Sequence, residues 1–204
     1  AIKGRLPKTK GKEPQKSKDT GGTIFCDHAP QYIHLSNQVL LRAGETLQSK
    51  QSFEREAQQF GVRIKSYRAD NHPFGSNKLN ADLDRLGQDI DFSGVGAHHQ
   101  NAVAERSIQT VTWWARAMLL HAVIMWPDTA NLELWPFALA HDIYLWNHLP
   151  RIDHGLAPIE LFSGTKFESH DFLQRLHVWG CPVYVLDPKL YILFIKLPKS
   201  HPTS

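Results

Sequence analysis

The chain has 204 residues, of which 42% are hydrophobic and 21% charged, with a net charge of +3. This length is enough for one domain, or one domain with appendages, to bury a core. No apolar run approaches the roughly 18 residues that a membrane span needs, and the basic N-terminus lacks the apolar segment of a signal peptide. Two distant cysteines, Cys26 and Cys181, suit a reducing compartment. We therefore expect an intracellular protein that makes no membrane contact.

The basic charge is concentrated at the start of the chain. Residues 1–20 carry seven Lys or Arg against two Asp or Glu, a net +5, so the rest of the chain sums to −2. A Lys-rich stretch with Gly and Pro and no apolar period is typical of a disordered loop or tail. It could contact phosphates through counterion release, although a solvated loop fits equally well.

Regular structure is predicted from about residue 21. Two β-prone runs, 22–28 and 32–41, are joined by Ala29-Pro30-Gln31 and indicate a hairpin. Apolar residues at helical spacing then predict an amphipathic helix over 44–60.

A second set of alternating elements follows. Residues 62–69 predict a strand that delivers Asp70 at its C-terminal end, before the turn residues of 71–75. A helix over 78–86 and a short strand over 90–92 come next. Because strands alternate with helices, the fold class is α/β with a mixed sheet.

A long helix is predicted from residue 101 to about 122. Its apolar positions fall on one face at spacings of three and four: Ile108, Val111, Ala115, Met118, Leu119 and Ala122. Glu105, Gln109, Thr112 and Arg116 form a stripe roughly 60° wide beside that face. We expect the apolar face to dock on the sheet and the polar stripe to border a cleft. An ordinary solvated helix edge is the alternative.

The helix also carries two adjacent tryptophans. Trp113 and Trp114 point to different sides, so we expect one in the core and the other at an interface or groove. A further helix is predicted over 132–149, stopped by Pro150. After it, 157–164 is expected to be a short connector and 176–188 a strand-like hook.

Asp70 and Glu105 are the candidate catalytic residues. They lie 35 positions apart, one after a strand and one near a helix start. Carboxylates on rigid elements are what Mg²⁺ needs beside a phosphate, and two such ions can activate an attacking oxygen and stabilise a leaving one. Most pairs of acidic residues at such a distance are solvated surface, so the pair alone is weak evidence.

The surrounding motifs resemble a known family. YRADN and GAHHQNAVAERSIQTVTWWARAML are similar to the catalytic core of retroelement integrases. The longer run, through LWPFALAHDIYLWNHLPR, APIELFSG and LHVWGCPVYV, resembles the copia type of LTR retrotransposon polyprotein, over about residues 21–190. The resemblance implies an RNase H-like mixed sheet flanked by helices. It also implies metal-dependent polynucleotidyl transfer: 3′-end processing of DNA followed by strand transfer.

The resemblance assigns roles by position. Asp70 and Glu105 would hold Mg²⁺ or Mn²⁺, while Gln109, Thr112 and Arg116 would meet the DNA end. The implied partners are the element ends, target DNA and further copies of the chain in a homo-oligomer. Such a protein would work in the nucleus after passing through a cytoplasmic particle.

The chain departs from the family pattern in its carboxylates. The family uses three, and only two stand in clear register. Asp27 could be the third, but by the resemblance an Asp there has a structural role. The strand with the first catalytic Asp is expected before Ala1, so we interpret the chain as a truncated, inactive fragment. His72 and Ala102 stand where the family has Gly, which costs on the order of 1 kcal/mol if either backbone needs positive φ.

These features predict four regions: a basic tail (1–20), a catalytic-core-like domain (21–150), a connector with the start of a C-terminal region (151–190) and a divergent tail (191–204). His98 and His99 could touch phosphate at the helix start, although solvent-facing loop histidines are more common. The alternative function is a non-catalytic nucleic-acid-binding or assembly module of the same fold. A hydrolytic RNase H-like nuclease fits less well.

Overall fold

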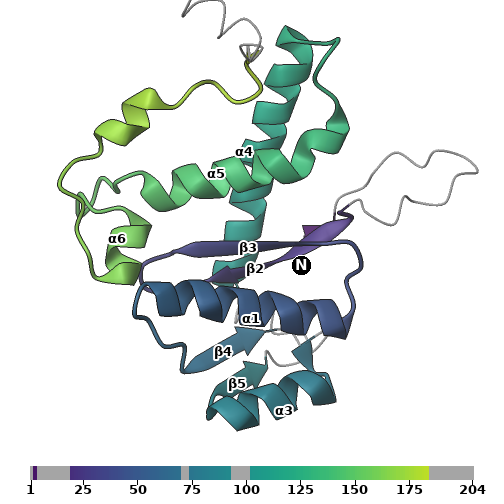
Figure 1. Ribbon diagram of the computed structural model, residues 1–204, viewed down its shortest axis with the longest axis vertical. Helices are drawn as coiled ribbons and strands as arrows, with labels where there is room; N and C mark the ends of the chain where they lie inside the picture. The colour runs from purple at the N-terminus through teal and green to yellow at the C-terminus, as the bar shows by residue number, and fades with distance from the viewer. Residues whose placement is uncertain (1, 4–18, 70–73, 93–101, 184–204) are drawn as a thin grey trace, which may run out of the picture.

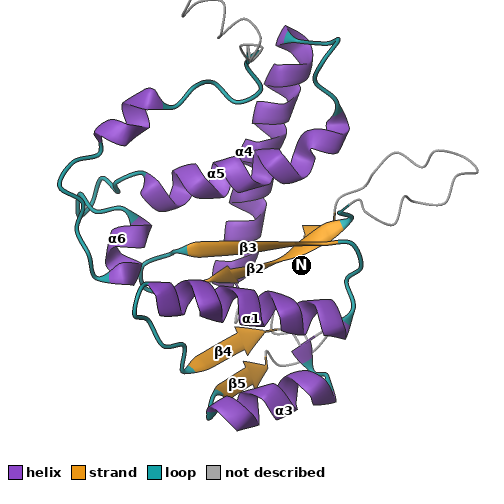
Figure 2. Cartoon of the chain, viewed as in Figure 1, coloured by secondary structure: helices purple, strands orange, loops and turns teal. Residues whose placement is uncertain are grey.

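The computed structural model describes residues 2–3, 19–69, 74–92 and 102–183. Three antiparallel strands, in the order β1-β2-β3, form one sheet: β1 (Ile2–Lys3), β2 (Gly21–Cys26) and β3 (Ile33–Gln38). Strands β4 (Ser66–Ala69) and β5 (Asp89–Phe92) pair in parallel as a second sheet. The helices are α1 (Ala43–Gln59), α3 (Asn77–Leu86), α4 (Ala102–Met125), α5 (Trp135–His148) and α6 (Pro158–Ser163), with 3-10 turns η2 (Leu132–Leu134) and η3 (Asp171–Arg175). The mixed α/β class is confirmed, and Figure 2 shows that helices predominate.

The hairpin β2–β3 separates two cores, because successive side chains of a strand point to opposite faces. Ile24, Cys26 and Ile33 face α4 and α5, where they pack with residues such as Val111. On the other face, Phe25 of β2 and Tyr32, just before β3, pack against Phe53 of α1 and Phe162 of α6. Figure 1 shows α1 along one side of this hairpin and α5 crossing α4 on the other.

The helix α5 also satisfies the free edge of β3. Asn147 accepts a hydrogen bond from the backbone N–H of Ile33 at 2.9 Å and donates one to its carbonyl at 2.7 Å. A side-chain amide therefore takes the place of a neighbouring strand at this edge. Helix α4, which packs against α5 and carries the candidate site residues, is thereby held to the sheet.

Three predicted elements differ from the structure. Of the strand predicted over 62–69, only the last four residues form a strand, β4. The N–H of Val62 still bonds to the carbonyl of Ala57 at the end of α1, so the chain becomes extended later than predicted. The connector over 157–164 contains a helix, α6, in which Glu160 accepts from the N–H of Ala157 at 2.7 Å and Gly164 ends the turn at φ +68°.

The hook predicted from residue 176 forms no strand in the part that the structure describes, 176–183. Gly180 has φ +82° and lies so close to α4 that an added Cβ would be 2.7 Å from Cβ of Ala122. The N–H of Cys181 bonds back to the carbonyl of Val178, so a turn replaces the strand. Among the described helices, none is both long and apolar enough to cross a membrane.

Candidate active site

Helix α4 presents the predicted polar stripe on its outer side. Its buried face consists of Ser107, Val111, Ala115, Leu119 and Ala122. The stripe residues Glu105, Gln109, Thr112 and Arg116 are all exposed. The apolar period that predicted the helix therefore also sets which of its side chains face outward. Their roles in catalysis and DNA binding remain predictions.

Asp70 lies outside the described residues, but both sides of its segment are placed. Strand β4 ends at the buried residue Ala69, immediately before it. The ring of Phe25 on β2 lies 6.1 Å from that of Tyr67 on β4 and 6.3 Å from that of Phe74. The residues described before and after Asp70 thus both pack on Phe25, near the C-terminal end of β2.

The first turns of α4 contact Cys26, the residue after Phe25 on β2. The Cys26 sulfur lies 3.3 Å from the hydroxyl oxygen of Ser107, which also donates to the carbonyl of Val103 at 2.9 Å. Burial raises the pKa of the Cys26 thiol, so the sulfur stays neutral and serves packing. Consecutive residues of β2, 25 and 26, therefore contact the described flanks of Asp70 on one face of the hairpin and the helix of Glu105 on the other.

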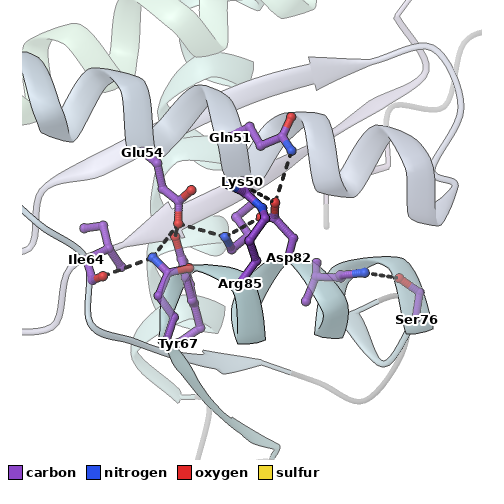
Figure 3. A network of polar contacts seen from close by, with 10 residues as sticks. Lys50, Gln51, Glu54, Ile64, Tyr67, Ser76, Asp82 and Arg85 are labelled. Atoms are coloured by element: carbon purple, nitrogen blue, oxygen red, sulfur yellow. Dashed lines mark hydrogen bonds and ion pairs between the residues drawn. The ribbon is translucent and has the colours of Figure 1, made fainter.

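A buried polar network fixes β4 on α1 (Figure 3). Glu54 accepts hydrogen bonds from the Tyr67 hydroxyl at 2.8 Å and from Gln88 at 2.7 Å, and it pairs with Lys50 at 2.8 Å. Lys50 also pairs with Asp82 of α3 at 2.8 Å. Burial and the nearby Glu54 raise the pKa of Tyr67, which keeps its proton as the donor. The network holds the strand that leads to Asp70.

The sequence patterns did not reveal this network. Lys50 and Glu54 have the spacing of a helical ion pair, which usually lies in solvent. Only the packing of α3 onto α1 makes Lys50 a buried cation.

Asp27 has a structural partner. Its Oδ1 accepts a hydrogen bond from the backbone N–H of Ala29 at 3.1 Å, within the turn of the hairpin. Such a bond is the usual role of Asp at a turn. Within the described ranges, no three His, Cys, Asp or Glu side chains come together as a metal site. The residues that the structure describes do not supply a set of ligands for two metal ions.

The tryptophan prediction was wrong. Both Trp113 and Trp114 are exposed, at 63% and 57%, because the buried face of α4 is made of small and aliphatic residues that pack closely on α5. Ala102 is the first residue of α4 and has no positive φ, so the absence of Gly there causes no strain. His72, His98 and His99 lie outside the described residues.

The comparisons with known proteins identify the fold. No family model and no curated protein matches the chain. The catalytic core of HTLV-2 integrase, solved in complex with magnesium in a trimeric form, matches at 13% identity with a TM-score of 0.51, over 74% of this chain and 89% of that one. Its dimeric form matches with a TM-score of 0.50, over 73% and 89%.

A larger assembly gives the same result. A chain of the simian T-cell lymphotropic virus intasome, in complex with the PP2A regulatory subunit B56 gamma, matches at 13% identity with a TM-score of 0.52. The match covers 85% of this chain and 55% of that chain. At such identities the likeness concerns architecture alone. The chain has the mixed α/β, RNase H-like fold of retroviral integrase catalytic cores.

Proposed function

We propose that this chain is the DNA integration core of a copia-type retrotransposon integrase, in a form that binds DNA but lacks a complete catalytic centre. The observation that carries the proposal is the convergence at the end of β2. Phe25 packs against both flanks of Asp70, and Cys26 contacts the helix that carries Glu105. The two contacts lie on opposite faces of β2, because successive side chains alternate, but at the same end of the strand. We propose that the two carboxylates, 35 positions apart in sequence, meet beyond that end in a shared site.

The chemistry of the family explains the role of each residue in an intact relative. A divalent cation, Mg²⁺ or Mn²⁺, would neutralise the charge that develops on the transferred phosphate. Asp70 and Glu105 would hold that cation, because hard cations prefer carboxylate oxygens. Gln109 and Thr112 would donate hydrogen bonds to the DNA end, and the guanidinium of Arg116 would pair with a backbone phosphate.

The same residues limit what this polypeptide can do. Two carboxylates do not fix two cations in a defined geometry, and Asp27 is engaged in its turn. We therefore propose DNA binding without nicking or strand transfer by this chain alone. The second candidate is a non-catalytic nucleic-acid-binding or assembly module. It is favoured by the hydrogen bond that Asp27 accepts within its turn, since that bond gives Asp27 a structural role. In either form we propose a nuclear homo-oligomer acting on DNA.

Manganese binding and DNA binding test the proposal together. We expect the parent chain to bind Mn²⁺ weakly, as measured by electron paramagnetic resonance, and Asp70→Asn and Glu105→Gln to lose that binding. Asp27→Asn is the matched control, because an amide oxygen preserves the turn and leaves the cation unaffected. All four proteins should bind duplex DNA.

Each other outcome selects a different function. Mn²⁺-dependent nicking or strand transfer by the parent chain would contradict the proposed loss of catalysis. If the proteins bind DNA but neither variant changes Mn²⁺ binding, the function is that of the non-catalytic nucleic-acid-binding or assembly module. Absence of DNA binding by the parent chain would overturn both readings.

A further inference from the structure

The outer face of α4 carries a large aromatic side chain among its polar residues. Trp113 is exposed and lies four positions after Gln109 and three before Arg116, so the three side chains are neighbours on the helix surface. Trp114 is rotated by about 100° from Trp113 and points to another side. Trp113 therefore belongs to the same surface as the candidate DNA contacts, whereas Trp114 does not.

The charge around Trp113 suits an anionic partner. The charged residues of α4 are Glu105, Arg106 and Arg116, all in its N-terminal two thirds and all exposed. Arg106 and Arg116 bracket Trp113 along the outer face, since they lie seven positions before it and three after it. An exposed indole with Arg116 one turn after it and Arg106 two turns before it has the composition of a surface that tracks a phosphate backbone and stacks its bases.

We propose that Trp113 is a stacking platform for a base of an unpaired DNA strand at the reacting end. This inference rests on the proposed function, since it names the form of DNA that the same site takes. A base inside a duplex has both faces covered by its neighbours, so any base beyond the terminal pair can stack on Trp113 only where the end is frayed or single-stranded. Trp113 would thus make the site prefer opened ends over blunt duplex.

The helix geometry limits which base is involved. Trp113 lies eight residues after Glu105, which is about 12 Å along the helix axis at about 1.5 Å per residue. Successive nucleotides of one strand are spaced by about 3.4 Å along a duplex axis. Because an unpaired strand is more extended than a duplex strand, the stacked base is at most about three to four nucleotides from the phosphate held at Glu105.

The test measures binding of labelled DNA by fluorescence anisotropy. The probes are a blunt duplex and the same duplex with a five-nucleotide unpaired 3′ end. We expect the parent to prefer the open end, and Trp113→Ala to lose at least about fivefold in affinity for it, the factor that one base–aromatic stack contributes at its weakest. Affinity for the blunt duplex should stay within about twofold, and Trp113→Phe should keep most of the preference.

Trp114→Ala is the matched control, because it removes an equally large exposed indole from the adjacent position. We expect it to bind both probes as the parent does. An abasic site moved along the unpaired strand supplies a second readout. It should abolish the difference between parent and Trp113→Ala at one position only, within about four nucleotides of the reacting phosphate.

The remaining outcomes overturn the proposal in distinguishable ways. Equal effects of the two alanine variants, or an equal loss on blunt and open DNA, would show that Trp113 does not stack on a base. Two exposed apolar residues, Leu120 and Ile124, continue the face of Trp113 toward the end of α4, and such a face could also contact protein. If Trp113→Ala instead dissociates an oligomer in sedimentation without changing open-end affinity, the face binds protein. A parent that binds neither probe would refute the proposed function as well.

Discussion

Replacing Lys50 by Met tests the network that holds the strand leading to Asp70. Lys50 is 1% exposed, and its ammonium lies 2.8 Å from carboxylate oxygens of both Glu54 and Asp82. Methionine matches the length of the lysine stem and preserves its packing. The substitution therefore removes the charge and leaves two carboxylates in place without their shared cation.

The expected cost is large because a buried ion pair loses one partner. Removing one member of such a pair costs about 3–5 kcal/mol. Here Arg85 still pairs with Asp82 at 2.7 Å, and Tyr67 still donates to Glu54. We therefore expect a loss near the lower limit, about 3 kcal/mol in the free energy of unfolding at pH 7.

The loss should depend on pH with a defined sign. Burial by itself raises the pKa of Asp82, but hydrogen bonds from Lys50 and Arg85 outweigh it and hold the pKa below its ordinary value of 3.8. A lowered carboxylate pKa contributes stability that is present above the unfolded value and is lost as the pH falls through the folded value. In Lys50→Met the carboxylate protonates more easily, so the difference from the parent should shrink below about pH 4.

Urea unfolding followed by circular dichroism at several pH values measures both effects. Arg85→Met is the control, because Arg85 binds the same carboxylate but its side chain is 65% exposed. It should cost less than about 1 kcal/mol. The reasoning would be refuted if Lys50→Met cost less than about 1 kcal/mol at pH 7, or if its cost were the same at acidic and neutral pH.

Three further substitutions test other contacts. Asp142 is 4% exposed, and burial raises its pKa to about 7 from an ordinary value of 3.8. The folded protein therefore loses stability as the pH rises from 3.8 to 7, because the buried carboxyl has to ionise. Asp142→Asn should therefore stabilise the fold at pH 8, by at most about 4 kcal/mol, and have no such effect at pH 3. Asn147→Ala leaves a buried N–H and C=O of β3 without partners and should cost about 2–5 kcal/mol in urea unfolding, whereas a cost under about 1 kcal/mol would mean that water replaces the amide. Gly180→Ala combines a left-handed backbone with an overlap on Ala122 and should lower the melting temperature more than Gly164→Ala, which has similar φ and open space around it.

The sequence determined the elements of this fold because their signals are local. The 3.6-residue apolar period of α4 predicted both the helix and its exposed stripe, and the observed bounds, Ala102–Met125, differ from 101–122 mainly at the C-terminal end. The hairpin followed from two β-prone runs around Pro30. Local signals overlooked α6, although Pro158 at its start and Gly164 at its end are ordinary helix boundaries.

Tertiary structure decided what those elements contact. Periodicity fixes the angle of a side chain around its own helix, but burial depends on which other element arrives there. Trp113 and Trp114 are both exposed because α5 covers only the side of α4 with small residues. Lys50 is buried because α3 brings Asp82 to it, and β2 meets the segments of two distant carboxylates at adjacent residues. These contacts join positions far apart in the chain, and no local pattern records them.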